Sequence, residues 1–276
     1  MQLKSINGNK IKVQNLAIET VQWPKKTPID DQAATKALAN NVLAFQTTRI
    51  TPDGYQAQQS QPFHYFNLGL HVGDCPTQVE KNRQFLQTLL PEKTKIQWLE
   101  QVHGNTAVEV SQISSQNIVA DAIYTSNKNI CLAIMTADCL PILLVSKSGD
   151  EIGAIHGGWR PLASNIIQNT IEKMKTSSEN IYAWLGPCIS QIAFEVGREV
   201  KKKFISQDES FQTAFLANGN GKYLADLHKI ATIQLNNLGV TQISNLSECT
   251  YSNTNKYYSF RKHAVTGRMA TLICLM

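Results

Sequence analysis

Three apolar runs in the middle of the chain constrain its fold more than any other feature. They are ICLAIM (residues 130–135), which polar residues bound, PILLVS (141–146) and IGAIH (152–156). Short, uninterrupted apolar runs predict strands that are buried on both faces. The turn KSGD (147–150) between the second and third runs has the composition of a β-hairpin. The sequence therefore predicts a sheet that is covered on both sides.

Segments with helical spacing alternate with these and other strands. Residues 76–90 and 227–239 predict helices, and residues 28–41 predict a helix or an ordered insertion. Residues 161–175 predict a helix whose first turn accommodates Pro161. We expect further strands at 42–49, 96–104, 181–187, 256–261 and 268–275. This mixture favours an α/β or α+β sandwich.

Composition and charge exclude several functional classes. A chain of 276 residues with 42% hydrophobic residues can bury a sizeable core, as one large domain or two closely packed halves. The formal charge of +5 is scattered, and the densest run, Lys201–Lys203, predicts a solvated helix face. The chain has no basic stripe interleaved with aromatic residues, which argues against nucleic acid as a partner. It lacks a signal-peptide core and an apolar stretch of roughly 20 residues, so we expect a cytoplasmic protein without a membrane span.

The six cysteines are too few and too dispersed for a disulfide framework. We expect reduced thiols at five of them, and no CxxC pair is present to form a four-cysteine zinc site. The five are Cys75, Cys131, Cys188, Cys249 and Cys274.

The sixth cysteine, Cys139, belongs to a group of three candidate reactive residues at the ends of predicted strands. His103 precedes Gly104, Cys139 lies between two strands, and His156 precedes a glycine pair. Strand ends that project into loops are where sheet proteins place reactive groups. Cys139 with a histidine could form a nucleophile and its base, or all three could form a zinc site with an open fourth position.

Several blocks stand out along the chain: FNLGLHVGD (66–74), QVHG (101–104), TADCLP (136–141), HGGWR (156–160), WLGPCI (184–189) with FEVG (194–197), and TGRMATLICL (266–275). In this order they resemble the YfiH family of laccase-domain or polyphenol oxidase proteins. The likeness runs from about Thr47 to the C-terminus. The family usually has HAGWRG where this chain has HGGWRP, and the loop after Arg49 also differs.

The resemblance implies a fold, a metal and an activity. The fold would be two packed mixed β-sheets flanked by helices, with residues 1–276 as a single domain. Zinc would be bound by His103, Cys139 and His156, with copper as an adventitious substitute. Family members are regarded as purine nucleoside phosphorylases with accompanying adenosine deaminase activity. Adenosine, inosine, guanosine or methylthioadenosine, together with inorganic phosphate, are therefore the expected substrates, and the free base and sugar 1-phosphate the expected products.

Phosphorolysis requires a phosphate beside the anomeric carbon and contacts to the sugar and the leaving base. Arg49 and Arg261 are candidates for the phosphate because a guanidinium fork matches its oxygens. Asn67 and His71 are candidates for the ribose or the base. Asp138 could contact the base or the surroundings of the metal.

Three other functions remain open on sequence grounds. The first is a cysteine hydrolase with Cys139 as nucleophile and His103 or His156 as base. The second is a copper-dependent laccase, although a multicopper site needs roughly eight further histidines beside a His₂Cys centre and the chain has six in all. The third is a zinc-stabilised interaction module. The stretch NGNGK (218–222) predicts a hairpin turn, since Tyr223 stands where a phosphate loop requires Ser or Thr.

Overall fold

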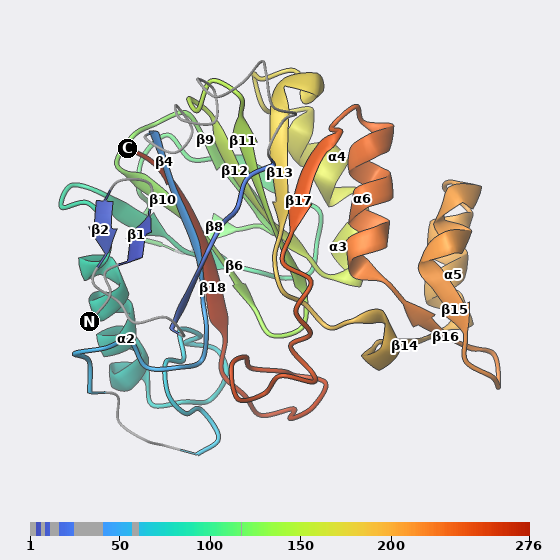
Figure 1. Cartoon of the computed structure of the whole chain (residues 1–276), viewed down its shortest axis with the longest axis horizontal. Helices are drawn as coiled ribbons and strands as arrows, with labels where there is room; N and C mark the ends of the chain where they lie inside the picture. The colour runs from blue at the N-terminus through green and yellow to red at the C-terminus, as the bar shows by residue number, and fades with distance from the viewer. Residues whose placement is uncertain (1–3, 7–8, 12–16, 25–40, 57–60, 117) are drawn as a thin grey trace.

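The structure is a computed structural model that describes residues 4–6, 9–11, 17–24, 41–56, 61–116 and 118–276. Two sheets form its centre (Figure 1). One has five strands, in the order β3 (Ile18–Thr20), β4 (Val42–Thr47), β18 (Met269–Leu275), β10 (Ile130–Thr136) and β5 (Lys95–Gln97). The other has six, in the order β17 (Gln242–Asn245), β13 (Ile181–Leu185), β11 (Leu140–Ser146), β12 (Ile152–Gly157), β9 (Ala122–Thr125) and β7 (Ala107–Glu109).

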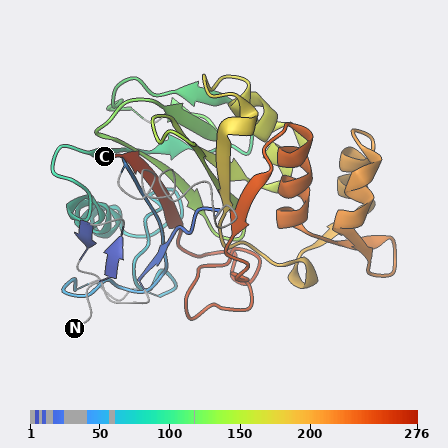
Figure 2. The same cartoon turned by 45° about the horizontal axis from the view of Figure 1, so that its top comes forward.

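Helices and smaller sheets complete the described part of the chain. The helices are α2 (Pro76–Thr88), α3 (Trp159–Ala163), α4 (Ile166–Ile171), α5 (Arg198–Ile205) and α6 (Leu227–Asn237), with 3-10 turns η1 (Ser178–Asn180), η2 (Gln191–Ala193) and η3 (Glu209–Ala214). The smaller sheets are β1 (Lys4–Ile6) with β2 (Asn9–Ile11), β6 (Leu99–Glu100) with β8 (Ile118–Val119), and β14 (Glu195–Gly197), β16 (Lys222–Ala225) and β15 (Phe215–Ala217). Figures 1 and 2 show α5 and this last sheet beyond α6, at the edge of the molecule.

The two large sheets pack face to face and helices cover their outer faces. Leu143 and Val145 of β11 pack with Leu132 and Ile134 of β10 in the core between the sheets. The alternate residues of β11 face outward and pack with α3, α4 and α6, whereas those of β10 pack with α2. Because side chains alternate along a strand, a strand covered on both faces must be apolar throughout. The predicted α/β/β/α sandwich is therefore confirmed.

Most of the predicted elements are present. The three apolar runs form β10, β11 and β12, and β11 and β12 pair as the predicted antiparallel hairpin. The segment NGNGK connects β15 and β16, which also pair antiparallel. Lys202 and Lys203 are exposed on α5, as predicted, whereas Lys201 is half-buried over the ring of Tyr223.

Three predicted elements differ from the structure. Residues 161–175 form no continuous helix, because Asn165 has a φ of +62° and separates α3 from α4. Residues 96–104 give only the end of β5 and the short β6, and QVHG lies in a loop. Residues 256–261 form no strand, and their two tyrosines are buried by tertiary contacts instead. The helix or insertion predicted at 28–41 lies almost wholly outside the described residues.

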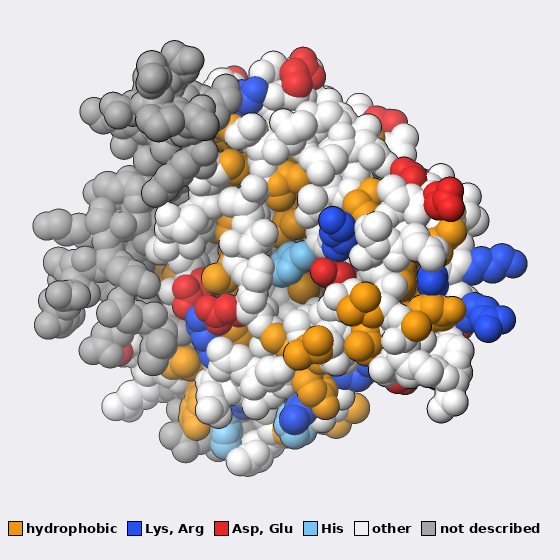
Figure 3. Space-filling view, turned by 45° about the vertical axis from the view of Figure 1, so that its right-hand side comes forward, with side chains coloured by type: hydrophobic (Ala, Val, Ile, Leu, Met, Phe, Trp, Pro, Cys, Tyr) orange, Lys and Arg blue, Asp and Glu red, His pale blue; other side chains and the backbone are white. Residues whose placement is uncertain are grey.

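The cysteines and the molecular surface agree with the composition. All six cysteines are free thiols, and Cys131, Cys188 and Cys274 are buried. On the face shown in Figure 3, Lys and Arg side chains are scattered among hydrophobic and polar ones. Within the described residues, no helix has both the length and the apolar character that crossing a bilayer requires.

Candidate metal centre

The β11–β12 hairpin brings Cys139 close to His156. In its antiparallel register, Leu140 pairs with Gly157. Cys139, one residue before Leu140, therefore lies beside Gly158. A Cβ atom at Gly158 would lie 3.2 Å from Sγ of Cys139, which is tighter than nine in ten real Cβ contacts. Glycine at this position therefore leaves room for the thiol.

A separate loop supplies His103, and a buried carboxylate holds that loop. His103 has a φ of +58°, in the left-handed region that few non-glycine residues adopt. The backbone N–H groups of Val102, His103 and Gly104 donate to the carboxylate of Asp121 at N–O distances of 3.3, 3.0 and 2.6 Å. Three consecutive amides that converge in this way form an anion-binding nest.

Gln101 attaches the same loop to β10. Its side-chain amide donates to the carbonyl oxygen of Met135 at 2.8 Å, and its carbonyl accepts from the Met135 amide at 2.7 Å. Met135 belongs to the five-stranded sheet, whereas Asp121 immediately precedes β9 of the six-stranded sheet. Both sheets therefore position His103.

The resulting cluster has the donor set and the spacing of a metal site. One ligand atom from each of His103, Cys139 and His156 lies within 4.8 Å of the others, and Sγ of Cys139 is 3.8 Å from Nε2 of His103. A tetrahedral zinc site requires about 3.6 Å between sulfur and nitrogen ligands. Nδ1 of His156 lies 2.8 Å from Oδ1 of Asp121, which leaves Nε2 as the ligand atom. A carboxylate behind a ligand histidine is typical of metal sites.

The electrostatics of the cluster favour deprotonated sulfur. Burial alone would raise the pKa of Cys139, but the charge on His156 and a hydrogen bond with His103 lower this pKa to about 6. Burial alone would lower the pKa of His156, but Cys139 and Asp121 raise this pKa to about 9. Burial opposes ionisation of Asp121, yet the hydrogen bond from His156 keeps the pKa of that carboxyl below its usual value. These shifts favour a thiolate–imidazolium pair over the neutral pair when no metal is bound.

The cluster opens into a cavity of about 250 Å³ with a cationic wall. Arg268 lies in this wall, and burial lowers the pKa of its guanidinium. Burial and the nearby charges of Arg268, Arg83 and His103 lower the pKa of His71. The lining residues include no carboxylate, so the cavity suits an anion. They are His71, Gln101, His103, Met135, Thr136, Ala137, Cys139, His156, Phe260 and Arg268.

The two arginines predicted to bind phosphate do not line this cavity. Arg49 donates through Nε to the carbonyl of His64 at 3.0 Å and through NH1 to that of Thr254 at 2.8 Å. Arg261 is exposed, and its NH1 donates to the carbonyl of Glu195 at 3.2 Å. Arg49 therefore holds loops together, while Arg261 lies at the surface.

Asn67 and Asp138 are buried beside the cavity, where both organise backbone. Asn67 accepts hydrogen bonds from the amides of Gly69 and Arg268, both at 2.9 Å. Asp138 accepts bonds from the hydroxyls of Thr250 and Ser259 and from the amide of Arg261. Of the five predicted substrate residues, only His71 lines the cavity.

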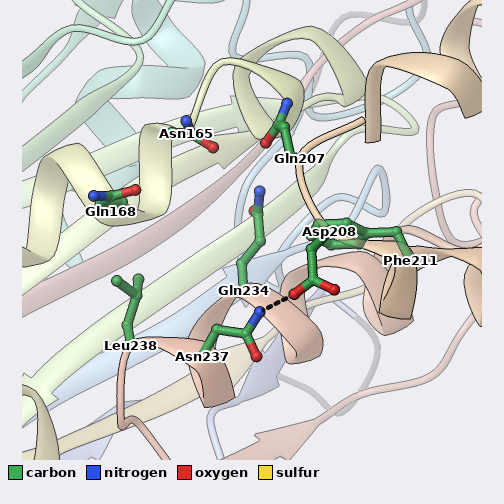
Figure 4. Close-up of a pocket in the computed structure, with 8 residues that line it drawn as sticks. All are labelled: Asn165, Gln168, Gln207, Asp208, Phe211, Gln234, Asn237 and Leu238. Atoms are coloured by element: carbon green, nitrogen blue, oxygen red, sulfur yellow. Dashed lines mark hydrogen bonds between the residues drawn. The ribbon is translucent and has the colours of Figure 1, made fainter. Parts of the chain in front are cut away.

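A second, larger cavity lies away from the cluster, between α4, α6 and the segment after α5. Its volume is about 390 Å³, and Asp208 is the one ionisable residue in its lining (Figure 4). The side-chain amides of Gln207, Gln234 and Asn237 donate to Ala163, Leu162 and Asp208, respectively. This cavity has no metal-binding set and offers little chemistry.

Four residues around the candidate centre were not predicted as site residues: Asp121, Gln101, Phe260 and Arg268. Gln101 and Arg268 do lie within the family blocks QVHG and TGRMATLICL. Those blocks were the available signal for them. Asp121 lies in no quoted block, and only the pairing of β9 with β12 brings it to His156.

The fold and cluster define a mixed α+β protein whose candidate metal centre opens into a cationic cavity. A family model described as multi-copper polyphenol oxidoreductase laccase matches residues 44–276, and the chain belongs to this family. The chain is 41% identical over 239 residues to the purine nucleoside phosphorylase YfiH of Shigella flexneri, covering 87% of this chain and 96% of that relative. It is also 41% identical over 239 residues to a purine nucleoside phosphorylase of Haemophilus influenzae, covering 84% and 94%.

Solved structures give the same assignment. A crystal structure of a Neisseria meningitidis protein matches with a TM-score of 0.83 at 35% identity, covering 94% of this chain and 99% of that one. The crystal structure of a hypothetical protein YfiH from Bacillus licheniformis matches with a TM-score of 0.77 at 26% identity, covering 85% and 93%. The resemblance to the YfiH family is therefore confirmed.

Proposed function

We propose that this chain is a zinc-dependent purine nucleoside phosphorylase that also deaminates adenosine. The observation that carries the proposal is a single cavity that joins the His–Cys–His cluster to a cationic wall. The names of the relatives support the phosphorylase activity. Residues 1–276 would act as one domain in the cytoplasm, on adenosine, inosine, guanosine or methylthioadenosine with inorganic phosphate.

In phosphorolysis, a phosphate oxygen attacks the anomeric carbon while the bond from that carbon to the base nitrogen breaks. The bonding pair leaves with the base, which must gain a proton. We assign the phosphate to Arg268 and His71 rather than to Arg49 or Arg261. Support comes from the position of Arg268 and His71 in the cavity lining, to which Arg49 and Arg261 do not contribute.

The residues present fit a zinc ion. Two imidazoles and a thiolate are the soft donor set that zinc accepts in open, catalytic sites. The described residues offer no fourth ligand-type side chain in this cluster, which argues against a closed structural site. When bound, zinc would supply a Lewis acid that polarises the substrate or an attacking water. Asp121 would hold the tautomer of His156, and Phe260 offers an apolar surface to a purine.

The second candidate is a cysteine hydrolase, and one contact favours it. Asp121 orients His156, which is paired electrostatically with Cys139, as in nucleophile–base–carboxylate arrangements. A thiolate committed to a metal is a poor free nucleophile, so metal content discriminates between the two functions. Copper in the same cluster would instead favour the laccase function that the family description names.

The experiment is metal analysis of the purified protein combined with nucleoside assays. We expect about one zinc per chain, loss of zinc in Cys139→Ala, and retention in Cys75→Ala, which removes an exposed thiol elsewhere. Base release from inosine should stop in phosphate-free buffer, whereas adenosine should still become inosine, because deamination needs only water.

Full zinc retention by Cys139→Ala would overturn the metal assignment. Rapid alkylation of Cys139 in metal-loaded protein would support the hydrolase, and stoichiometric copper with phenol oxidation would support the laccase.

A further inference from the structure

A single oxygen atom links the two histidines of the cluster. Oδ1 of Asp121 lies 3.0 Å from the backbone nitrogen of His103 and 2.8 Å from Nδ1 of His156. Oδ2 of the same carboxylate accepts from the amides of Gly104 and Val102. Asp121 is fully buried, and its one carboxylate contacts both histidine segments.

The loop that carries His103 depends on this carboxylate for its shape. Three successive N–H groups point at one centre only when the backbone takes a nest conformation, and converging donors repel one another unless an anion fills the nest. The left-handed φ of His103 is part of that conformation. In the absence of the anion, the strained backbone has no compensating contact.

The ring of His156 depends on the same carboxylate for its orientation. The His156 amide donates to the Asp121 carbonyl at 2.8 Å, so the two residues face each other across adjacent strands. The acceptor at Nδ1 fixes the tautomer and directs Nε2 toward Cys139.

We propose that Asp121 is the positioning residue that assembles this centre before a metal binds. Its carboxylate shapes the loop of His103 and orients the ring of His156 at the same time. The inference rests on the proposed function insofar as the cluster holds a metal, but the preformed loop does not require one. An amide in place of the carboxylate keeps the shape, yet it has one acceptor oxygen where two are needed. In Asp121→Asn the amide NH₂ replaces one oxygen. It then faces either the Val102 and Gly104 amides or the donors of the two histidines, so part of the donor set loses its acceptor.

The test compares Asp121→Asn with Glu151→Gln by chelator competition for zinc and by the visible spectrum of the cobalt-loaded proteins. Glu151 is a matched control, because it is a buried carboxylate that accepts the amides of Lys175 and Thr176 at the opposite end of β12. We expect a 10- to 100-fold loss of zinc affinity and an altered cobalt spectrum in Asp121→Asn. Glu151→Gln should lower the thermal stability while keeping both metal readouts unchanged. Unchanged affinity and spectrum in a folded Asp121→Asn would overturn the proposal.

A second measurement needs no variant. In metal-free wild-type protein, the amides of Val102, His103 and Gly104 should be protected from hydrogen exchange, because the carboxylate rather than the metal holds them. Exchange as fast as in exposed loops would show that the nest is not preformed and would overturn the inference. A wild-type protein that binds no metal, but keeps these amides protected, would instead count against the zinc-dependent function alone.

Discussion

At the scale of single residues, the charged side chains that line the cavity determine which ligand it can bind. Arg268 lines it, and Asn67 holds the backbone amide of Arg268 in place. Arg49 carries the same guanidinium, but two of its nitrogens are already bonded to backbone carbonyls. Arg268 also donates to backbone carbonyls, through NH1 to those of Thr266 and Gly267. Its place in the cavity lining is therefore what distinguishes it from Arg49.

This difference predicts that Arg268→Ala will separate the two proposed reactions. Loss of a charge-assisted contact costs about 1.5–3 kcal/mol, so phosphorolysis of inosine should fall about 10- to 150-fold. Deamination of adenosine should change little, because it uses no phosphate. Arg268→Lys should recover part of the rate, since an ammonium lacks the fork. Chromatography of free base and inosine measures both reactions.

Arg49→Lys is the control and should leave the KM for phosphate unchanged. An equal loss of both activities in Arg268→Ala would assign this residue to the nucleoside or the fold.

At the scale of elements, the hairpin and the helix break after it form one unit. β12 ends at His156 and Gly157, α3 follows at once, and Asn165 then turns the chain into α4. The side chain of Asn165 makes no capping hydrogen bond, although its backbone lies in the left-handed region. Residue 165 is thus constrained by its left-handed backbone conformation rather than by a side-chain contact.

We therefore expect opposite effects from two substitutions at Asn165. Asn165→Gly should keep the stability within about 0.5 kcal/mol, because glycine enters the left-handed region freely. Asn165→Val should lower the free energy of unfolding by about 1–2 kcal/mol, because a branched Cβ clashes there. Urea denaturation measures both. Gln168→Val on the exposed face of α4 supplies the control and should cost only a few tenths of a kcal/mol. Equal destabilisation by Asn165→Val and Gln168→Val would contradict this account of the break.

At the scale of the whole molecule, the C-terminal loop ties distant parts of the chain together. Nζ of Lys256 lies 2.7 Å from Glu19 on β3 and 2.8 Å from Glu248. The carbonyl of Lys256 also accepts the amide of Arg49, directly after β4. Burial alone would lower the pKa of Lys256, but the hydrogen bonds to the two glutamates raise it above 10.5.

The raised pKa predicts a stability contribution with a defined pH window. A folded-state pKa above the unfolded value stabilises the fold fully below pH 10.5 and loses this effect as pH rises through the folded pKa. Lys256→Met should therefore lower the free energy of unfolding by about 1.5–3 kcal/mol at pH 8. The difference from wild type should shrink above pH 10.5. Urea titrations at both pH values measure it, with Lys175→Met as the control for an exposed pair worth at most about 0.5 kcal/mol. A difference that grows in alkali would contradict the assignment.

The elements that the sequence predicted correctly share one physical cause. β10, β11 and β12 are covered on both faces, so burial alone makes them continuous apolar runs. The strand predicted at 256–261 is absent, because loop contacts rather than a sheet bury Tyr257 and Tyr258. The hydroxyl of Tyr258 donates to the carbonyl of Phe63, and that of Tyr257 to Glu248. An apolar pattern indicates that a segment is buried. It indicates a strand only where the segment is buried as part of a sheet.

For the candidate centre, the sequence by itself determined which reactive residue types are available and that they lie at the ends of predicted strands. It predicted His103, Cys139 and His156 from their places at the ends of predicted strands and from the family blocks, because those features are local. Only the tertiary structure decided that Asp121 stands behind both histidines, and that Arg268 rather than Arg49 faces the cavity. The register in which β9 pairs with β12 decides the first, because it places Asp121 beside His156. The segments that meet at the cavity wall decide the second, since they include Arg268 and leave Arg49 outside the lining. Both outcomes depend on which distant segments of the chain meet in the fold, and local sequence patterns do not show those contacts.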